Sequence, residues 1–408
     1  MRTRLASVVG GAAILALVVT AGCGGGETPA PTNNNGEVPA PEVKEPIKIG
    51  ALFAVTGPAA WLGKPESDTA LMVASQINEA GGVTGKGEGR PIEVIVKDTE
   101  GDNAKAVRMI KELIREGVVA IIGPSRSGTS MAVVPIAGEE EVPLVSCAAA
   151  ESIIKPVAER TWVFKTPQTD ADCARRIFEH MKAKGITKVA IINGQTGFGS
   201  FGAKQLKALA PEYGMTIVAE QSYAPNAIDM TAQLTNIRNS GAEALVNWSI
   251  VAAQSQVAVD MKKLGITIPL YQSHGFGNVK YAQAAGEAGA GTIFPAGRLL
   301  IADTLEDDNE QKAVLTKYKA DYEAAAGGAV STFGGHAYDA LWLVVEAIKK
   351  GGATRTGIRD ALETSDFVGT AGHFKMSDQD HCGLDKEAFE MLTVEWKDGK
   401  ATFVKLAE

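Results

Sequence analysis

Three glycines with the spacing of a dinucleotide-binding loop lie in the stretch AIINGQTGFGSFGAKQL, residues 190–206. Gly197, Gly199 and Gly202 form G-x-G-x-x-G between an apolar run and a helical pattern, and Glu220 follows eighteen residues later. This pattern is typical of a loop that holds a nucleotide pyrophosphate, so an NAD-dependent oxidoreductase is one hypothesis. In dinucleotide folds the first glycine follows the strand directly, whereas residues 193–196 intervene here. We favour a flexible strand-to-helix turn whose backbone approaches a ligand closely.

The other catalytic motifs are incomplete. Each Gly-Lys pair lacks the Ser or Thr of a phosphate-binding loop, and Ser152 with Lys155 forms S-x-x-K without a Ser-Asp-Asn partner. The segment GHFKMSDQDHCGLD, residues 372–385, gathers histidines, carboxylates and a cysteine in a partial calcium-loop pattern. The twelfth position of that loop needs a bidentate carboxylate and is Phe389 here. We therefore expect a polar turn in this segment, and neither a metal nor another cofactor.

The loop GPSRSGTS, residues 123–130, follows the apolar run VVAIIG and precedes a helical pattern. Its hydroxyls and the free N–H groups of a helix start would suit a carboxylate or another anion. A plain helix cap formed by Ser127 or Thr129 is the alternative. We favour the anion site, because SCAAAES, residues 146–152, repeats the strand-to-turn arrangement in the next unit.

A repeated unit must position these loops. An amphipathic helical pattern, a glycine and an apolar run recur along the chain, as in MIKELIREG followed by VVAIIG. In that helix Ile110 and Leu113 fall on one face, and Gly117 stands where a C-terminal cap belongs. These strands are apolar throughout, without the polar–apolar alternation of a half-exposed strand, and each is followed by a helix. This order indicates an α/β protein with parallel sheets. A body of about 360 residues is too large for one core, so we expect two doubly wound lobes with their strand ends toward a shared crevice.

Further patterns complete the expected element order. Helical patterns return at residues 306–326, 334–350 and 356–364, and FEMLTVEWKDGKATFVKL, residues 389–406, predicts a hairpin. The stretch Thr169-Asp170-Ala171-Asp172 predicts a capped helix start.

The N-terminal segment predicts export. Arg2 and Arg4 precede an apolar run from residue 8 to 19, and small residues at 20–22 stand before Cys23. This is the layout of a secretory signal, and the run is too short for a membrane anchor. It resembles a bacterial lipobox, in which Cys23 is lipidated and becomes the mature N-terminus, while a plain signal peptide is the alternative. Residues 24–46 are rich in Gly, Pro and Asn, and we expect them to be a flexible tether.

Charge and cysteine content exclude two classes of protein. Removing Arg2 and Arg4 from 40 basic residues leaves 38 against 48 acidic ones, a net charge of −10, which disfavours a nucleic-acid partner. Besides Cys23, the chain holds Cys147, Cys173 and Cys382, so at most one internal disulfide can form and disulfides are not the framework.

The ordered series of loops resembles the leucine/isoleucine/valine-binding branch of type I periplasmic binding proteins, the receptors of amino-acid ABC importers. The resemblance covers nearly the whole mature body, and the stretches that carry it are IKIGALFAVTGPAAWLG, VVAIIGPSRSGTS, VPLVSCAAAES, INGQTGFGSFG, LGITIPLYQSHGFGN and HAYDALWLVVEAI. It implies two lobes, in a Venus-flytrap arrangement, joined by three crossings that we place near residues 166–169, 296–298 and 366–371. The expected parts are a lipoprotein signal peptide (1–22), a lipidated cysteine with its tether (23–46), an N-terminal lobe (47–167 plus 297–368) and a C-terminal lobe (168–296 plus 369–408).

The resemblance also implies where the ligand binds. The family's carboxylate-holding serine falls on Ser127, an aromatic residue that packs on the ligand falls on Phe198, and the lid of the first lobe lies at Trp61. Backbone groups of Ala148 and Ala150 are expected to contribute. The expected ligand-binding set is Trp61, Arg126, Ser127, Ala148, Ala149, Ala150, Phe198, Trp248 and His274.

Two positions depart from the family pattern. Ala150 stands where a threonine helps to bind an α-amino group, and His274 stands where an acid balances the ammonium. An ammonium without a partner would be costly to bury, unless Asp170 at the hinge compensates, although Asp170 is also a helix-cap residue. The aromatic residues near the cleft favour an aromatic or other apolar carboxylate as the alternative ligand. Arg126 could pair with such an acid, and a solvent-facing Arg126 is the equal alternative.

The expected function is therefore an extracytoplasmic receptor without enzymatic activity. Its ligand is a small carboxylate, first a branched-chain or other apolar amino acid and second an aromatic or other non-amino carboxylate or amide. The expected partners are this small molecule, the membrane permease subunits of an ABC importer, and the membrane through the lipid anchor, with the protein itself a monomer that faces the periplasm or the cell surface. A sensor that reports the ligand without transport and the oxidoreductase hypothesis remain as competing functions.

Overall fold

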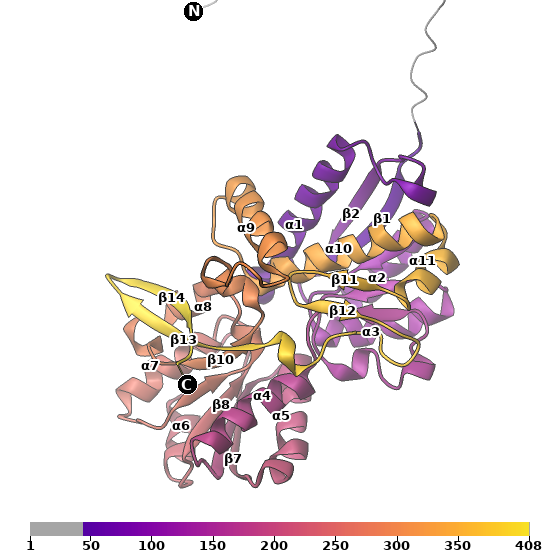
Figure 1. The fold of residues 1–408 in the computed structure, drawn as a ribbon. Coiled ribbons are helices and arrows are strands. Elements are labelled where there is room, and N and C mark those ends of the chain that lie inside the picture. The colour runs from indigo at the N-terminus through magenta and orange to yellow at the C-terminus, as the bar shows by residue number, and fades with distance from the viewer. Residues whose placement is uncertain (1–43, 408) are drawn as a thin grey trace, which may run out of the picture. The chain divides into compact units, whose positions relative to one another are not determined.

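The computed structural model describes residues 44–407, which form two α/β lobes built on separate sheets (Figure 1). The predicted signal peptide, the lipidation site Cys23 and nearly all of the tether lie outside these residues. No helix between residues 44 and 407 has the length and apolar character needed to span a bilayer.

The first lobe contains a five-stranded sheet of order β2-β1-β3-β4-β5, in which every pair is parallel. Its strands are buried on both faces because helices cover the sheet, which explains their unbroken apolar runs. The strands are β1 (Ile47–Phe53), β2 (Ile92–Asp98), β3 (Ala120–Ile122), β4 (Leu144–Ser146) and β5 (Val163–Lys165). The helices that pack on them are α1 (Ala60–Glu79), α2 (Asn103–Arg115), α3 (Ser127–Glu139), α10 (Thr332–Gly351) and α11 (Arg355–Leu362).

The second lobe contains a seven-stranded sheet of order β14-β13-β10-β9-β8-β6-β7. The five strands from β10 to β7 are parallel, and the predicted C-terminal hairpin adds two antiparallel strands at the β10 side of the sheet. The strands are β6 (Lys188–Gly194), β7 (Thr216–Tyr223), β8 (Ala244–Trp248), β9 (Leu270–Gln272), β10 (Ile293–Ala296), β13 (Glu390–Lys397) and β14 (Lys400–Lys405). The helices of this lobe are α4 (Asp170–Ala183), α5 (Gly197–Leu209), α6 (Thr231–Arg238), α7 (Gln254–Lys263) and α8 (Val279–Ala285). The prediction of two doubly wound parallel-sheet lobes is confirmed.

Three stretches of chain connect the lobes. The first lies between β5 and α4, and the second follows β10 and leads to α9 (Lys312–Ala326) and α10. The third begins after the short pair β11 (Asp366–Val368) and β12 (His373–Lys375). Side chains from Ala371 to Ala388 still pack in the core of the first lobe, whereas Phe389 joins that of the second. The lobe limits stay predictions, and this packing favours a last boundary near residue 389 rather than 369.

Local signals in the sequence account for several element ends. Gly117 has φ +82° directly after the C-cap of α2, and the Thr169 hydroxyl caps α4 by accepting a hydrogen bond from the Asp172 N–H (3.0 Å). The cap of α3 differs from the expectation, because Arg126 occupies the N-cap position and Ser127 is already the first helical residue. Helix α9 also begins six residues later than its pattern suggested, after a short irregular segment.

Candidate functional site

A narrow cavity lies between the lobes at the carboxyl ends of their parallel strands. Apolar side chains, two serines, one cysteine and two histidines surround it. The lining residues are Leu62, Ser125, Ser127, Cys147, Ala148, Ala149, Pro167, Phe198, Ile250, His274, Gly275, Phe333 and His336.

Helix α3 begins at this cavity. Its first intrahelical hydrogen bond joins the Ser130 N–H to the Arg126 carbonyl (2.8 Å), so the three N–H groups before Ser130 have no partner within the helix. The Ser127 oxygen accepts a hydrogen bond from the Ala150 N–H (3.3 Å), which leaves the hydroxyl proton free to donate. Donors gathered at the positive end of a helix suit an anionic ligand group.

Helix α5 of the second lobe begins opposite α3, at the glycine loop. The Thr196 side chain caps it by accepting a hydrogen bond from the Gly199 N–H (3.1 Å). Gly197, the first helical residue, lies so close to the first lobe that a Cβ there would be 2.9 Å from the Gly128 Cα. Two helix N-termini from different lobes therefore meet beside the cavity.

Packing explains the spacing of the three glycines. A Cβ at Gly199 would lie 2.0 Å from the Gly194 carbonyl oxygen, and a Cβ at Gly202 would lie 2.1 Å from the Trp248 ring. The first lobe itself occupies the space in front of Gly197, where a dinucleotide fold would place the pyrophosphate. The loop is thus a close-packed strand-to-helix turn.

Direct contacts hold the lobes together around the cavity. The Asn278 side-chain amide of the second lobe donates to the Trp61 carbonyl (2.8 Å), and the Gln205 amide donates to the Glu151 carboxylate (3.3 Å). The Thr332 N–H at the start of α10 donates to the Gly277 carbonyl (3.0 Å). These contacts describe a closed arrangement in which the cavity is enclosed from several sides.

The carboxyl nearest to the serines is buried behind them. Glu66 is fully buried and accepts a hydrogen bond from the Ser125 hydroxyl, whose oxygen accepts one from the Ala54 N–H (3.0 Å). Burial raises the pKa of Glu66 well above its usual value. Among the lining residues within the described range there is no Asp, Glu, Lys or Arg.

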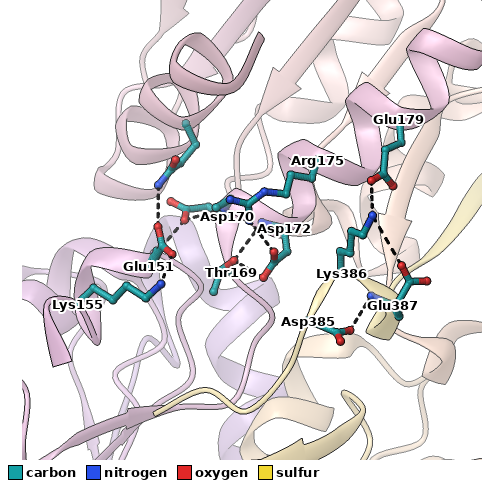
Figure 2. A network of polar contacts seen from close by, with 12 residues as sticks. Glu151, Lys155, Thr169, Asp170, Asp172, Arg175, Glu179, Asp385, Lys386 and Glu387 are labelled. Carbon is teal, nitrogen blue, oxygen red and sulfur yellow. Dashed lines mark hydrogen bonds and ion pairs between the residues drawn. The ribbon is translucent and has the colours of Figure 1, made fainter. Parts of the chain in front are cut away.

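Asp170 lies at the first crossing and has a structural task. Its carboxylate oxygen Oδ1 accepts hydrogen bonds from the backbone N–H groups of Glu151 (3.0 Å) and Ala171 (3.0 Å), and Figure 2 shows Asp170 beside Glu151 at the start of α4. Burial raises the pKa of Asp170 to about 6. Asp170 thereby ties the turn after β4 to α4, and it is not among the residues that line the cavity.

Five residues of the predicted binding set line the cavity. Ser127, Ala148 and Ala149 come from the first lobe, and Phe198 and His274 come from the second. The two groups were far apart in the sequence, and closure of the lobes brings them together.

The structure places the other four predicted residues outside the lining. The Arg126 guanidinium donates to the Gly101 carbonyl (3.0 Å), and Ala150 is fully buried, with its N–H on Ser127. Trp248 is also fully buried and packs against Phe198 and His274, with ring centroids 5.8 and 5.9 Å apart. Trp61 packs on Tyr281 (5.4 Å between centroids) and contributes its carbonyl to the lobe contact.

Sequence reasoning missed the contribution of α10. Phe333 and His336 lie in its first turns and line the cavity, although this helix follows the second crossing and packs mainly on the first lobe. The available signal was a histidine on an otherwise apolar helix face, since Phe333, His336, Ala337 and Ala340 repeat at helical spacing.

The cysteines and the acidic tail segment hold neither a disulfide nor a metal cluster within residues 44–407. Cys147, Cys173 and Cys382 are all buried free thiols, and no group of three His, Cys, Asp or Glu side chains in that range is placed to hold a metal ion. Within the tail segment, His373 lies between the carboxylates of Glu310 (3.1 Å) and Asp366 (2.6 Å).

Two α/β lobes that close on a small cavity are typical of binding proteins that hold a solute between hinged lobes. A family model described as periplasmic binding protein matches residues 46–400, and the chain belongs to this family.

Individual relatives indicate which branch of the family this chain resembles. The leucine-, isoleucine-, valine-, threonine- and alanine-binding protein of Pseudomonas aeruginosa is 24% identical over 88% of this chain and 92% of the relative. An extracellular ligand-binding receptor from Rhodopseudomonas palustris superposes with a TM-score of 0.80 at 27% identity, over 88% of this chain and all of that one. LivJ of Streptococcus pneumoniae, solved in complex with isoleucine, superposes with a TM-score of 0.74 at 25% identity, over 89% of this chain and all of that one. The resemblance to the leucine/isoleucine/valine-binding branch is confirmed.

Proposed function

We propose that this protein is the solute-binding receptor of an ABC importer and that its lobes close on a small carboxylate. The observation that carries the proposal is the meeting of the α3 and α5 N-termini at a small cavity without charged lining residues. Ser127 and the free N–H groups of α3 supply hydrogen-bond donors for a carboxylate, and the apolar wall accommodates the body of the ligand.

Apolar amino acids are the first candidate ligands, because relatives are named for leucine, isoleucine and valine. A specific observation favours the second candidate, a non-amino carboxylate such as an aromatic acid. An amino acid brings an ammonium group, and the acids nearest the cavity are Glu66, whose pKa burial raises well above its usual value, and Asp170, which is already bonded to two N–H groups. Burying an ammonium without a charged partner costs free energy.

Binding and closure are coupled in this proposal. A ligand first occupies one lobe, and rotation about the three crossings then brings Phe198 and His274 onto it. The ligand stabilises the closed state only to the extent that it makes contacts that the open state lacks. The permease subunits of the importer recognise the closed form, and a sensor function without transport remains the alternative use of the same closure.

Attachment to the membrane is part of the proposal. Cys23 follows the small residues of an export signal, and a multiply acylated cysteine would hold the body at the membrane through residues 24–46. Mass spectrometry of the mature protein tests this step. We expect acyl groups on Cys23 as the first residue, and an unmodified N-terminus at another position would contradict the anchor.

A thermal-shift screen tests the binding function. The purified protein is heated with leucine, isoleucine, phenylalanine, benzoate, 4-hydroxybenzoate or NAD, and we expect at least one carboxylate, but not NAD, to raise the melting temperature. For the best binder, Ser127→Ala should weaken affinity about tenfold or more, because a hydrogen bond to a charged group contributes roughly 1.5–3 kcal/mol. Ser152→Ala is the control, since Ser152 contacts Met131 (3.6 Å) and does not line the cavity. Stabilisation by NAD alone would favour the oxidoreductase hypothesis.

A further inference from the structure

Two buried histidines from different lobes line the cavity. His274 follows β9 in the second lobe and is 7% exposed, and His336 lies in α10 of the first lobe and is 6% exposed. The Thr166 hydroxyl at the first crossing donates to the His336 carbonyl (3.0 Å), and the His274 N–H meets the Cys173 sulfur (3.4 Å) at the start of α4. The backbone of each histidine is therefore tied to the first crossing or to the helix that follows it.

The ring nitrogens of these histidines lack hydrogen-bond partners. Both nitrogens of His274 and Nδ1 of His336 are buried without a partner among residues 44–407. Buried polar groups are nearly always hydrogen-bonded in folded proteins, so each exception calls for an explanation. The cavity that both side chains line is the place from which a partner can come.

The surroundings keep both imidazoles neutral. Burial and the nearby Lys165 ammonium lower the pKa of His274 well below its ordinary value and that of His336 to about 3. Lys165 is fully buried, donates to the Pro167 carbonyl and makes no ion pair within residues 44–407. A neutral imidazole offers one donor and one acceptor, and a second cation would be repelled at this end of the cavity.

We propose that His274 and His336 bind a neutral hydrogen-bonding substituent of the ligand, so that the ligand is a carboxylate without an ammonium group but with a hydroxyl or carbonyl on its apolar body. This inference rests on the proposed binding of a carboxylate at α3. A hydroxyl both donates and accepts, and it therefore matches a pair of neutral imidazoles. Phe198, Phe333 and Ile250 supply an apolar wall for a ring or a branched chain.

Isothermal titration with benzoate, 3-hydroxybenzoate, 4-hydroxybenzoate and isoleucine tests the inference. We expect one hydroxybenzoate to bind wild-type protein about tenfold or more tighter than benzoate and isoleucine, because benzoate leaves the imidazoles unpaired. His336→Leu should remove most of this preference while benzoate still binds. A merely structural role of His336 would weaken all ligands equally and leave the ratio unchanged.

A control histidine outside the cavity separates specific from general effects. His180 contacts the Tyr271 hydroxyl (2.9 Å) and does not line the cavity, so His180→Gln should keep the hydroxybenzoate-to-benzoate ratio. Equal binding of hydroxybenzoate and benzoate, or tighter binding of isoleucine than of both, overturns this inference and leaves the carboxylate receptor in place. If none of these four carboxylates binds at millimolar concentration, the inference is overturned, and so is the proposed receptor function for carboxylates of this size.

Discussion

The contact between Gly197 and Gly128 predicts a substitution that weakens binding without weakening the fold. In Gly197→Ala the new Cβ would lie 2.9 Å from the Gly128 Cα and amide nitrogen, both backbone atoms of the other lobe. Carbon atoms in contact normally lie about 3.5–4.0 Å apart, so full closure is obstructed. Overpacking of this kind costs roughly 1–3 kcal/mol, which corresponds to about 5- to 150-fold weaker ligand binding.

The open protein has no such conflict. The other atom near the new Cβ is the end of the flexible Phe201 ring at 3.6 Å, and alanine is a better helix former than glycine by roughly 0.5–1 kcal/mol. The melting temperature without ligand should therefore stay equal or rise, while titration calorimetry with the best binder of the carboxylate screen shows the loss of affinity. Gly138→Ala, at a helical glycine of α3 with nothing within 4 Å, is the control and should leave affinity unchanged. Unchanged affinity in Gly197→Ala would refute the reasoning that this contact belongs to the ligand-bound state.

Three further predictions concern packing, charge and pH. Gly202→Ala should lower the free energy of unfolding by about 1–3 kcal/mol in urea titrations, because its Cβ would overlap a buried indole ring, and unchanged stability would contradict that packing. Arg126→Ala should change the affinity for the best carboxylate less than twofold, because the guanidinium bonds the Gly101 carbonyl, and a tenfold loss would place it in the ligand site. Burial and Lys165 lower the pKa of His336 to about 3 from about 6.5 in the unfolded chain, so the folded state binds fewer protons between these values. Stability is thus lost as pH falls from 6.5 toward 3, and His336→Gln should lose less than wild type over that range, by up to about 1.4 kcal/mol per pH unit. Wild type and His336→Gln losing stability equally as pH falls would contradict this shift of the His336 pKa.

Much of the fold follows from local patterns in the sequence. Unbroken apolar runs such as VVAIIG predicted strands covered on both faces, and caps such as Gly117 and Thr169 marked helix ends correctly. The end of the first lobe was harder to locate, because the segment from residue 371 to 388 is largely irregular and its side chains pack into a core formed by distant strands. Such packing leaves no periodic signal along the chain.

The site residues could be predicted where a loop follows the carboxyl end of a parallel strand. Ser127, Ala148, Ala149, Phe198 and His274 all come from such loops and line the cavity. The direction of a side chain within a loop was not predictable.

Tertiary contacts decide those directions. The Arg126 side chain turns toward a neighbouring loop carbonyl, and Trp248 points into the core, where it fills the space that Gly202 leaves open. His336 was missed because its helix reaches the cleft only through the chain's return to the first lobe. These outcomes depend on contacts between segments far apart in the sequence.

A crystal structure with the best binder of the carboxylate screen tests the central claim most directly. The account predicts the ligand in the cavity between the lobes, with a carboxylate oxygen about 2.7–3.2 Å from the Ser127 hydroxyl and the first N–H groups of α3. Its apolar body should lie against Phe198. A ligand bound outside this cavity, or one whose carboxylate faces His274 and His336 instead of α3, would contradict the account.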